Sequence, residues 1–278
     1  MGLRISTNLA SMAAQRVLTA NQGATTKNMT RLASGDRITS AADDAAGLSI
    51  SERLRGQIRS LKQAQRNSND GISLIQVAEG GLSEVSNSLI RMRELAVQAA
   101  SDTIGDRERG FIDQEIQQLK IEVDRLADST TFNDTNLLNG ESQKDMLEIQ
   151  VGSYNRESDR IGYKASDYNI RTSNIGIDGT HVRDIESARE SLSQVDAALD
   201  RVNGFRASLG AMQNRLQSTS NSLGISVESL SAANSRIRDT DIAEDSAELV
   251  KRNILNSANI TVLSQANQSP SNALRLLA

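Results

Sequence analysis

The sequence contains no cysteine, no tryptophan and a single proline, Pro270, and its aromatic residues are three phenylalanines and three tyrosines in 278 residues. The absence of cysteine excludes disulfides and thiolate chemistry. The scarcity of proline removes the commonest obstacle to long helices. Because so few bulky residues are available, we expect thin helical packing, in which a seam uses about two positions in seven, and no large globular core.

Charge and hydropathy exclude further classes of protein. The formal net charge of -4 gives no sequence-wide attraction to nucleic acid or to anionic membrane surfaces. No apolar run approaches the roughly 20 residues of a membrane span, and the stretch MGLRISTNLASMAAQRVL lacks the continuous apolar core of a signal peptide. We therefore expect no nucleic-acid partner, no membrane insertion, and any export to proceed without a cleaved signal.

Catalytic motifs are also missing. His181 is the only histidine, and it lies in the polar stretch DGTHVRD, which we expect to be a solvated loop. A two-histidine zinc motif, Gly-x-Ser-x-Gly, glycine-rich phosphate loops and dinucleotide fingerprints are absent. These absences predict a protein that is not an enzyme and has no catalytic, cofactor-binding or metal-binding residues.

A long hydrophobic periodicity is the strongest positive signal. Positions three and four residues apart are apolar with one exception, Ser68, and their mean step is close to the heptad period. This pattern predicts a helix from Ala45 to Ala100 that packs against partner helices. Gly80 and Gly81 lie inside it, and we expect a bend or a close backbone contact there. The positions are Leu54, Ile58, Leu61, Ala64, Ser68, Ile72, Ile75, Ala78, Leu82, Val85, Leu89, Met92, Leu95 and Ala99.

Segments 106–128 and 185–237 continue the same step, so Leu89 and Leu216 should be buried on seams of different helices. Short links between three heptad helices favour an antiparallel bundle. Between them, MLEIQVG alternates apolar and polar residues and, with DRIGYKAS, predicts a β-hairpin at about residues 145–168. The expected fold is mostly α: an elongated antiparallel heptad bundle with a short β-hairpin, plus paired N- and C-terminal helices.

The two ends of the chain each carry a separate apolar stripe. Each stripe is long enough for a helix but marginal alone in water. Because these helices can pair with each other and with copies of themselves, their apolar residues are candidates for polymerisation. The candidates are Ile5, Leu9, Met12 and Val17 near the start, and Leu249, Ile254, Ala258 and Leu263 near the end.

Two adjacent carboxylates, Asp43 and Asp44, could belong to a metal or acid/base site or mark the start of the long helix. Ser40 and Asp43 have the spacing of a capping box, and both carboxylates would lie at the positive end of the helix dipole. No histidine, cysteine or further acidic cluster is near them in sequence. We therefore favour the helix start.

Long blocks of the sequence resemble bacterial flagellins: RISTNLASMAAQRVL, LASGDRITSAADDAAGLSISERLRGQIRSLKQAQRNSNDGISLIQVAEGGLSEV, IRMRELAVQAAS, FNDTNLLNG and LSAANSRIRDTDIAEDSAELVKRNIL. The resemblance implies a structural subunit that polymerises into the extracellular bacterial flagellar filament used for swimming. It also implies that residues 1–40 and 241–278 form an inner-tube domain, that residues 41–240 form a rod-like domain around it, and that the large variable outer domains are absent.

The same resemblance implies partners: copies of the chain itself, an export chaperone, and cap and hook-junction proteins. Leu89, Arg91, Leu95 and Glu115 match positions that contact the next subunit and, in many species, an animal Toll-like receptor. Two alternatives stay open. A hook-filament junction protein would share the terminal helices, whereas a signalling coiled coil of the chemoreceptor type would share the heptads but not the hairpin and the apolar termini.

Overall fold

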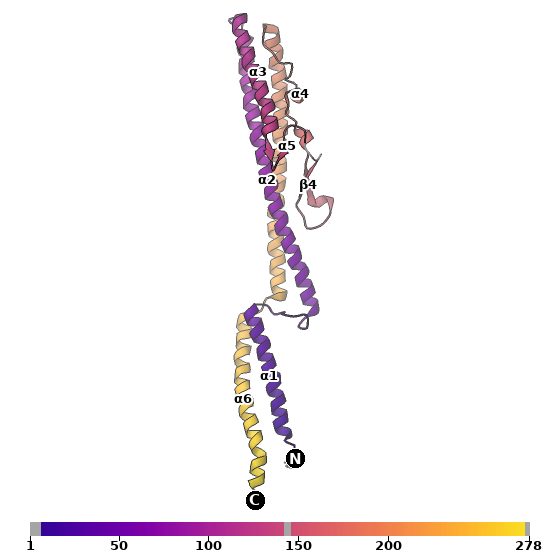
Figure 1. The fold of residues 1–278 in the computed structure, drawn as a ribbon, viewed down its shortest axis with the longest axis vertical. Coiled ribbons are helices and arrows are strands. Elements are labelled where there is room, and N and C mark those ends of the chain that lie inside the picture. The colour runs from indigo at the N-terminus through magenta and orange to yellow at the C-terminus, as the bar shows by residue number, and fades with distance from the viewer. Residues whose placement is uncertain (1–6, 142–145, 276–278) are drawn as a thin grey trace. The chain divides into compact units, whose positions relative to one another are not determined.

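The computed structural model describes residues 7–141 and 146–275. The chain divides into two compact units: one combines the N-terminal part up to Gly56 with the C-terminal part from Ser229, and the other is Gln57–Glu228 (Figure 1). The boundaries of these units fall inside two long helices that contribute to both. The expected boundaries at residues 40 and 241, between an inner-tube domain and a rod-like domain, stay a prediction.

The bundle of the second unit is built from α2 (Ala45–Ala99), α3 (Asp106–Ser129) and α5 (Ile185–Arg238), so the three predicted heptad helices are confirmed. Helices α3 and α5 both run antiparallel to α2 (Figure 1). Ion pairs fix this direction, because Arg93 meets Asp196 of α5 while Glu79, earlier in α2, meets the later Arg206.

The core of the second unit follows the predicted seam. From Ile75 to Ala99, every predicted seam position of α2 is at most 2% exposed, and Leu216 of α5 is fully buried. The one polar seam position, Ser68, is also buried, and its hydroxyl donates to the carbonyl of Ala64 at 2.9 Å. The heptad seam is therefore confirmed, and its polar interruption is satisfied within its own helix.

The glycine pair inside α2 makes a close contact. A Cβ atom on Gly81 would lie 2.7 Å from Thr130 Oγ1 and 2.8 Å from Leu138 Cδ1, whereas one on Gly80 would meet nothing within 4 Å. Helix α2 is continuous through both residues. The sequence predicted either a bend or a close backbone contact at this pair, and the structure shows the close contact. Because Gly81 has no side chain, Thr130 and Leu138, which follow α3, can pack against α2.

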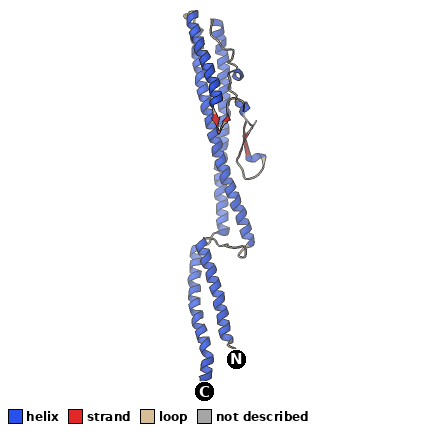
Figure 2. Ribbon diagram, viewed as in Figure 1, coloured by secondary structure: helices blue, strands red, loops and turns tan. Residues whose placement is uncertain are grey.

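The segment between α3 and α5 contains two small antiparallel sheets (Figure 2). Strands β1 (Thr131–Phe132) and β2 (Thr135–Asn136) are joined through Asn133 and Asp134, which both have positive φ. Strands β3 (Leu147–Gln150) and β4 (Arg160–Tyr163) form the predicted hairpin. Short helices η1 (Glu157–Asp159), η2 (Ala165–Tyr168) and α4 (Thr172–Ile175) complete the segment.

Polar side chains of α3 hold this segment against the bundle. Asp124 accepts hydrogen bonds from the Thr172 backbone N–H and hydroxyl at 2.9 and 3.0 Å. Asp113, which is 5% exposed, accepts from the N–H of Val182 at 3.1 Å. Each contact satisfies a backbone donor that burial would otherwise leave unpaired.

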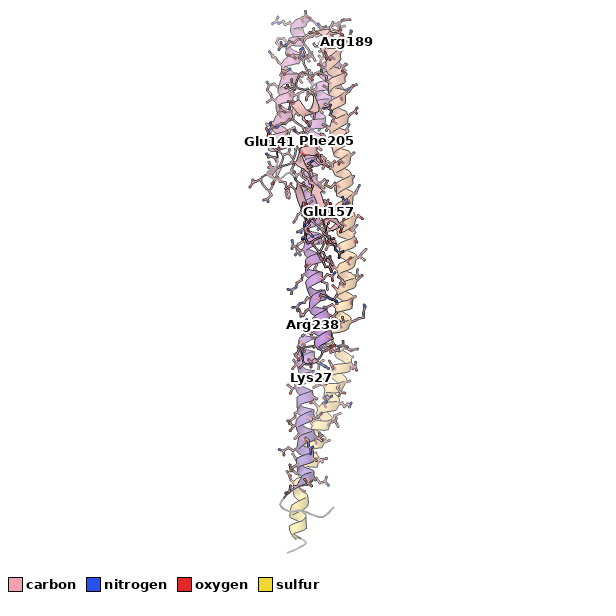
Figure 3. The ribbon with its side chains drawn as sticks, turned by 90° about the vertical axis from the view of Figure 1, so that its right-hand side faces the viewer. Lys27, Glu141, Glu157, Arg189, Phe205 and Arg238 are labelled. Atoms are coloured by element: carbon pink, nitrogen blue, oxygen red, sulfur yellow. The ribbon has the colours of Figure 1, made fainter. Side chains whose placement is uncertain are left out.

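Aromatic residues provide the rest of the attachment. Tyr163 is fully buried, its hydroxyl donates to the carbonyl of Leu137 at 2.6 Å, and burial raises the pKa of that hydroxyl well above its usual range. The rings of Tyr163 and Tyr168 stack, and Tyr168 meets Phe205 of α5 edge to face. Phe205 is labelled in Figure 3. Three of the six aromatic residues of the chain thus help to fix the non-helical segment to α5.

The first unit contains an antiparallel helix pair, α1 (Leu9–Ser34) and α6 (Ile242–Arg275) (Figure 1). Asn8 caps α1, since its side-chain oxygen accepts from the N–H of Ser11, and Gly35 ends α1 in the left-handed conformation that a helix C-cap favours. Asp241 accepts from the N–H groups of Ala243 and Glu244 at the start of α6. The predicted terminal helices are therefore confirmed as a pair.

The adjacent carboxylates mark a helix start, but the capping residue differs from the predicted one. Helix α2 begins at Ala45, and Asp44 is its cap, because Asp44 Oδ1 accepts from the N–H of Gly47 at 2.8 Å. Ser40 belongs to the preceding turn, where its N–H and hydroxyl donate to Asp43. The interpretation of Ser40 as the cap was wrong because a second carboxylate, one residue later, reaches the free N–H groups of the helix.

Candidate assembly surface

The face by which α1 and α6 pair is mostly small or polar. On each helix, the residues that are not exposed include a set that follows heptad spacing. We call these two sets of residues the terminal seam, and each set contains only two large aliphatic residues. The set on α1 is Ser11, Ala14, Leu18, Asn21, Thr25, Asn28 and Leu32, and that on α6 is Leu249, Arg252, Asn256, Asn259, Leu263 and Ala266.

Hydrogen bonds between side chains and backbone hold the terminal seam. Asn21 Nδ2 donates to the carbonyl of Arg252 at 3.0 Å and to Asn256 Oδ1 at 2.6 Å, and Asn256 in turn donates to Thr25 at 3.3 Å. At the other end of the pair, Asn8 donates to the carbonyl of Ala266 at 2.8 Å. Polar contacts of this kind fix the register of two helices but add little net stability.

Two buried groups of the terminal seam, Asn28 Nδ2 and Arg252 Nε, have no hydrogen-bond partner among the described residues. Asn28 is 6% exposed, and among the described residues its Nδ2 has no hydrogen-bond acceptor. A buried donor without an acceptor costs about 1–3 kcal/mol. The α1–α6 pair therefore holds its register without being strongly stabilised by its own contacts.

The large apolar residues of both terminal helices lie mainly outside the terminal seam. Leu9, Met12 and Val17 are 65, 57 and 55% exposed, and Ile254 is 65% exposed. Of the other sequence candidates, Ala258 is exposed, Leu249 and Leu263 are half-buried in the seam, and Ile5 lies outside the described residues. Of the described candidates, only Leu249 and Leu263 therefore help to join the two helices within one chain.

Further exposed apolar residues enlarge the surface beyond the predicted set. Met29 of α1 is 54% exposed, and on α6 four residues are between 54 and 58% exposed: Ile242, Val250, Ile260 and Val262. Sequence reasoning missed Met29, Ile260 and Val262 because they do not follow a single stripe. A helix with apolar residues on several sides is typical of one that is surrounded by other helices. We call the exposed apolar residues of α1 and α6 the terminal apolar surface.

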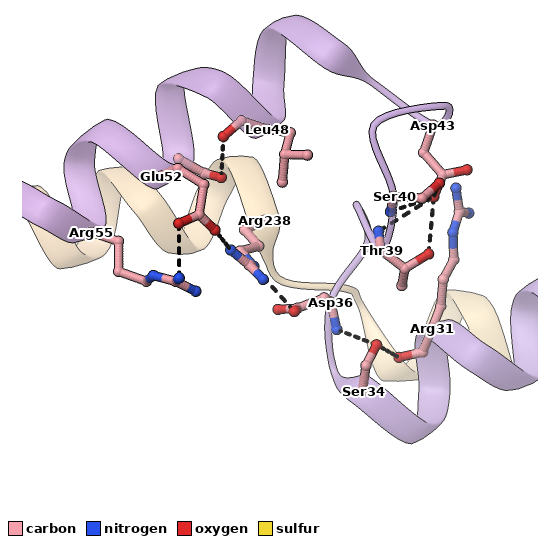
Figure 4. Close-up of polar contacts among 11 residues, drawn as sticks. Arg31, Ser34, Asp36, Thr39, Ser40, Asp43, Leu48, Glu52, Arg55 and Arg238 are labelled. Atoms are coloured by element: carbon pink, nitrogen blue, oxygen red, sulfur yellow. Dashed lines mark hydrogen bonds and ion pairs between the residues drawn. The ribbon is translucent and has the colours of Figure 1, made fainter.

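A polar network joins the segment that follows α1 to the segment that precedes α6 (Figure 4). Arg238, at the end of α5, binds Asp36 at 3.1 Å and Glu52 at 2.7 Å, and these two carboxylates raise its pKa. Backbone bonds run beside it, from the N–H of Arg37 to the carbonyl of Arg238 and from the N–H of Thr240 to that of Gly35. The C-terminal end of α1 and the N-terminal end of α6 are therefore held close to each other.

The second predicted surface, around α2 and α3, divides into core and exposed parts. Leu89 and Leu95 are 0 and 2% exposed, so both belong to the core of the bundle. Arg91 and Glu115 are exposed and form an ion pair at 2.8 Å, and Arg91 also meets Glu94 at 3.1 Å. Any partner that meets this face would contact the charged pair, while the two leucines fix the helix that carries it.

Other kinds of site find little support in the part of the chain that the structure describes. Within residues 7–141 and 146–275, no helix is long and apolar enough to span a bilayer. In the same ranges, no three histidine, cysteine, aspartate or glutamate side chains gather as metal ligands would. His181 is exposed, and its Nδ1 lies 2.9 Å from the carbonyl oxygen of Gly179.

Comparison with known proteins decides the family. Residues 5–143 match the model of the bacterial flagellin N-terminal helical region, and residues 192–277 match that of the C-terminal helical region. The chain belongs to the bacterial flagellin family. As a flagellin it is a structural protein, a subunit of the flagellar filament that lies outside the cell. Only residues 144–191 separate the two matches, so the predicted lack of large outer domains is confirmed.

Similar proteins agree with this assignment over nearly their whole length. A flagellin of Halalkalibacterium halodurans is 43% identical over 273 residues, which cover 98% of this chain and 99% of that protein. The flagellar filament 30.7 kDa core protein of Treponema maltophilum is 38% identical over 286 residues, with 98 and 99% covered.

One solved structure shares the fold of this chain at low sequence identity. A putative flagellar hook-associated protein from Vibrio parahaemolyticus superposes with a TM-score of 0.58 over 71% of this chain and 100% of its own, at 16% sequence identity. The helical fold is therefore shared with that protein. The sequence separates the two, because its identity to filament proteins is more than twice as high.

Proposed function

We propose that this flagellin polymerises through the terminal apolar surface, which includes Leu9, Met12, Val17, Ile254 and Ala258, together with the other predicted residues, Ile5, Leu249 and Leu263. The observation that carries the proposal is the separation of two roles on the same helices. Polar residues such as Asn21 and Asn256 fix the pairing of α1 with α6. Large apolar residues such as Leu9 and Ile254 stay 65% exposed.

Burial of these side chains on assembly supplies the free energy of polymerisation. Each large aliphatic side chain contributes roughly 1.5–3 kcal/mol when it moves from water into an apolar contact. Contacts within one chain do not provide this burial for Leu9, Met12, Val17 or Ile254, because the terminal seam leaves them exposed. Ordering of α1 and α6 is therefore coupled to addition of the subunit to the polymer, as binding that favours the folded form requires.

A charge in the terminal apolar surface tests the proposal. The variant Leu9→Asp places a carboxylate where neighbouring copies would pack, at a cost of several kcal/mol per subunit. The control is Ile121→Asp on α3, because Ile121 is equally exposed, at 61%, but lies outside α1 and α6. We expect both monomers to keep the wild-type melting curve, and only Leu9→Asp to lose the filaments that sediment in the wild type. Normal filaments from Leu9→Asp would contradict the proposal.

The proposal also covers the partners that the flagellin resemblance implies. The role is structural and not enzymatic, and the partners are copies of the chain, an export chaperone, and cap and hook-junction proteins. On the outer face of α2 and α3, Arg91 and Glu115 are the exposed members of the predicted contact set with the next subunit or with an animal Toll-like receptor. Leu89 and Leu95 support that face from beneath.

A further inference from the structure

A groove of about 380 Å³ lies in the second unit, between α2, the β1–β2 turn and strand β3. Its apolar lining is formed by Leu74, Phe132, Leu147 and Ile149. Gly71 brings the backbone of α2 close to β3, since a Cβ there would lie 2.6 Å from Ile149 Cδ1. The groove is therefore an apolar recess that the fold itself shapes on the side of the bundle.

Two carboxylates line the groove beside these apolar residues, and they differ in their partners. Glu148 pairs with Arg160 at 3.1 Å, so its charge is balanced within the chain. Asp70 is exposed, and no hydrogen bond or ion pair of its carboxylate is found among the described residues. The groove thus combines apolar walls with one unbalanced negative charge.

The complementary feature lies on the first turns of α3. Phe111 is 59% exposed, and Arg107 stands four residues before it, on the same face of the helix. Arg107 is exposed and has no ion pair among the described residues. Tyr154, which is also exposed, already has Arg156 over its ring at 5.0 Å. The ring of Phe111 and the free guanidinium of Arg107 therefore form an apolar and cationic projection, the inverse of the groove.

Other exposed apolar residues of the second unit lack this complementarity. Ile225 is 67% exposed, but the charged residue on its face one turn later is Glu228, which has the same sign as Asp70. Ile121 has Arg125 one turn later on its face, but Arg125 is already paired with Glu122. Charge therefore selects Phe111 and Arg107 over these alternatives.

We propose that the groove receives Phe111 and Arg107 of a second copy of this chain, with Arg107 paired to Asp70. This inference rests on the proposed polymerisation and adds a specific contact between the helical bundles of neighbouring subunits. Arg109 binds the carbonyl of Ala99, so the projection is level with the end of α2, whereas the groove surrounds Gly71. At 1.5 Å per residue the two features are roughly 40 Å apart along α2.

This separation has a consequence for the geometry of assembly. Because projection and groove do not overlap, one subunit can offer both at once, to two different neighbours. A contact between two different surfaces of identical subunits is heterologous, and when its rotation does not close a ring it generates an open helical polymer. The proposed contact therefore has the symmetry that a filament requires.

A charge exchange tests the proposed pair. Arg107→Asp would face Asp70 with a like charge, and Asp70→Arg would face Arg107 in the same way, so each single variant should raise the critical concentration for polymerisation about 3- to 10-fold. The double variant restores opposite charges and should return the critical concentration to within about 2-fold of the wild type. Phe111→Ala should raise it about 10-fold or more.

The outcomes separate this inference from the proposed function. The three residues that these variants change are all exposed, so wild-type monomer melting curves verify that each variant folds. If wild-type chains polymerise but the two charge changes add in the double variant, the contact between Arg107 and Asp70 is refuted while polymerisation stands. If wild-type chains fail to polymerise, or Leu9→Asp polymerises normally, the proposed function itself fails.

Discussion

The two helical seams of this chain use opposite chemistry. The seam of the second unit is aliphatic, and its central positions, such as Leu89 and Met92, are fully buried by residues of the same chain. The terminal seam is built around Asn21 and Asn28, and the large apolar residues of its helices remain exposed. One unit is therefore completed by its own chain, whereas the other places its hydrophobic residues where only another molecule can cover them.

This difference shows how a helix pair can be prepared for assembly without being stable alone. An aliphatic seam supplies both register and stability to a coiled coil, whereas buried asparagine supplies register at a cost in stability. By placing polar residues inside and apolar residues outside, the ends of the chain fix which helices pair and reserve the stabilising burial for the polymer. Substitutions in the two seams test whether they differ in this way.

The largest effect is expected from the aliphatic seam. Leu89→Ala or Leu216→Ala removes a fully buried side chain and should lower the free energy of unfolding of the monomer by roughly 2–5 kcal/mol. Leu18→Ala is the matched change in the terminal seam, where Leu18 is only half-buried, and should cost far less. Urea denaturation followed by helical circular dichroism compares the three variants. Equal losses from Leu18 and Leu89 would remove the distinction between the seams.

A smaller effect is expected when the polar pair is made apolar. Exchanging Asn21 and Asn256 together for leucine removes both hydrogen-bonding partners and should stabilise the α1–α6 pair of the isolated chain by about 1–2 kcal/mol. Asn21→Leu alone leaves the Asn256 side chain without its donor and should destabilise the pair. Amide hydrogen exchange in α1 and α6 measures both variants. Effects of the same sign in the single and double variants would show that the asparagines do not act as a pair.

The smallest effect concerns the turn before α2. Hydrogen bonds from Lys27 and then from Thr39 hold the pKa of Asp43 well below its usual range. Because the pKa is lower in the folded state than the ordinary value of about 3.9, the stabilisation is present above pH 4 and is lost as the pH falls towards the folded-state pKa.

Asp43→Asn should therefore weaken amide protection at the start of α2 near pH 6, and the difference from the wild type should shrink on acidification. Because the Lys27 side chain is 48% exposed, we expect the change to be slight. A difference between the variants that grows towards low pH would have the wrong sign for this contact.

The sequence predicted the second unit well because its signals are local and of one kind. Leu89 and Leu216 stand in heptads that are mostly apolar, and the hairpin of β3 and β4 alternates with period two. The terminal seam escaped prediction because Asn21, Thr25 and Asn256 have the composition of a solvated face. Only the position of a partner helix shows that such residues are enclosed, and that the more hydrophobic residues beside them are not.

The groove and its proposed occupant were beyond prediction for a different reason. Gly71, Phe132 and Ile149 come from three separate segments, so their meeting depends on how the hairpin packs on α2. Phe111 does have a sequence signal, since an aromatic residue four positions after an arginine on a polar helix face is conspicuous. That signal gains meaning only when the charge of Asp70 is seen to lack a partner in the part of the chain that the structure describes.

The sequence distance across the terminal seam sets an order of events in time. Asn8 and Ala266, which are joined by a hydrogen bond, are 258 residues apart, so the helix that is synthesised first has no partner until almost the whole chain exists. Closing so long a loop is entropically costly and cannot begin early. The bundle, whose α2 and α3 are neighbours in sequence, can form meanwhile. A chain that is still growing, or has only partly crossed a channel, is therefore unable to present a finished α1–α6 pair, and this delays self-association until the subunit is whole.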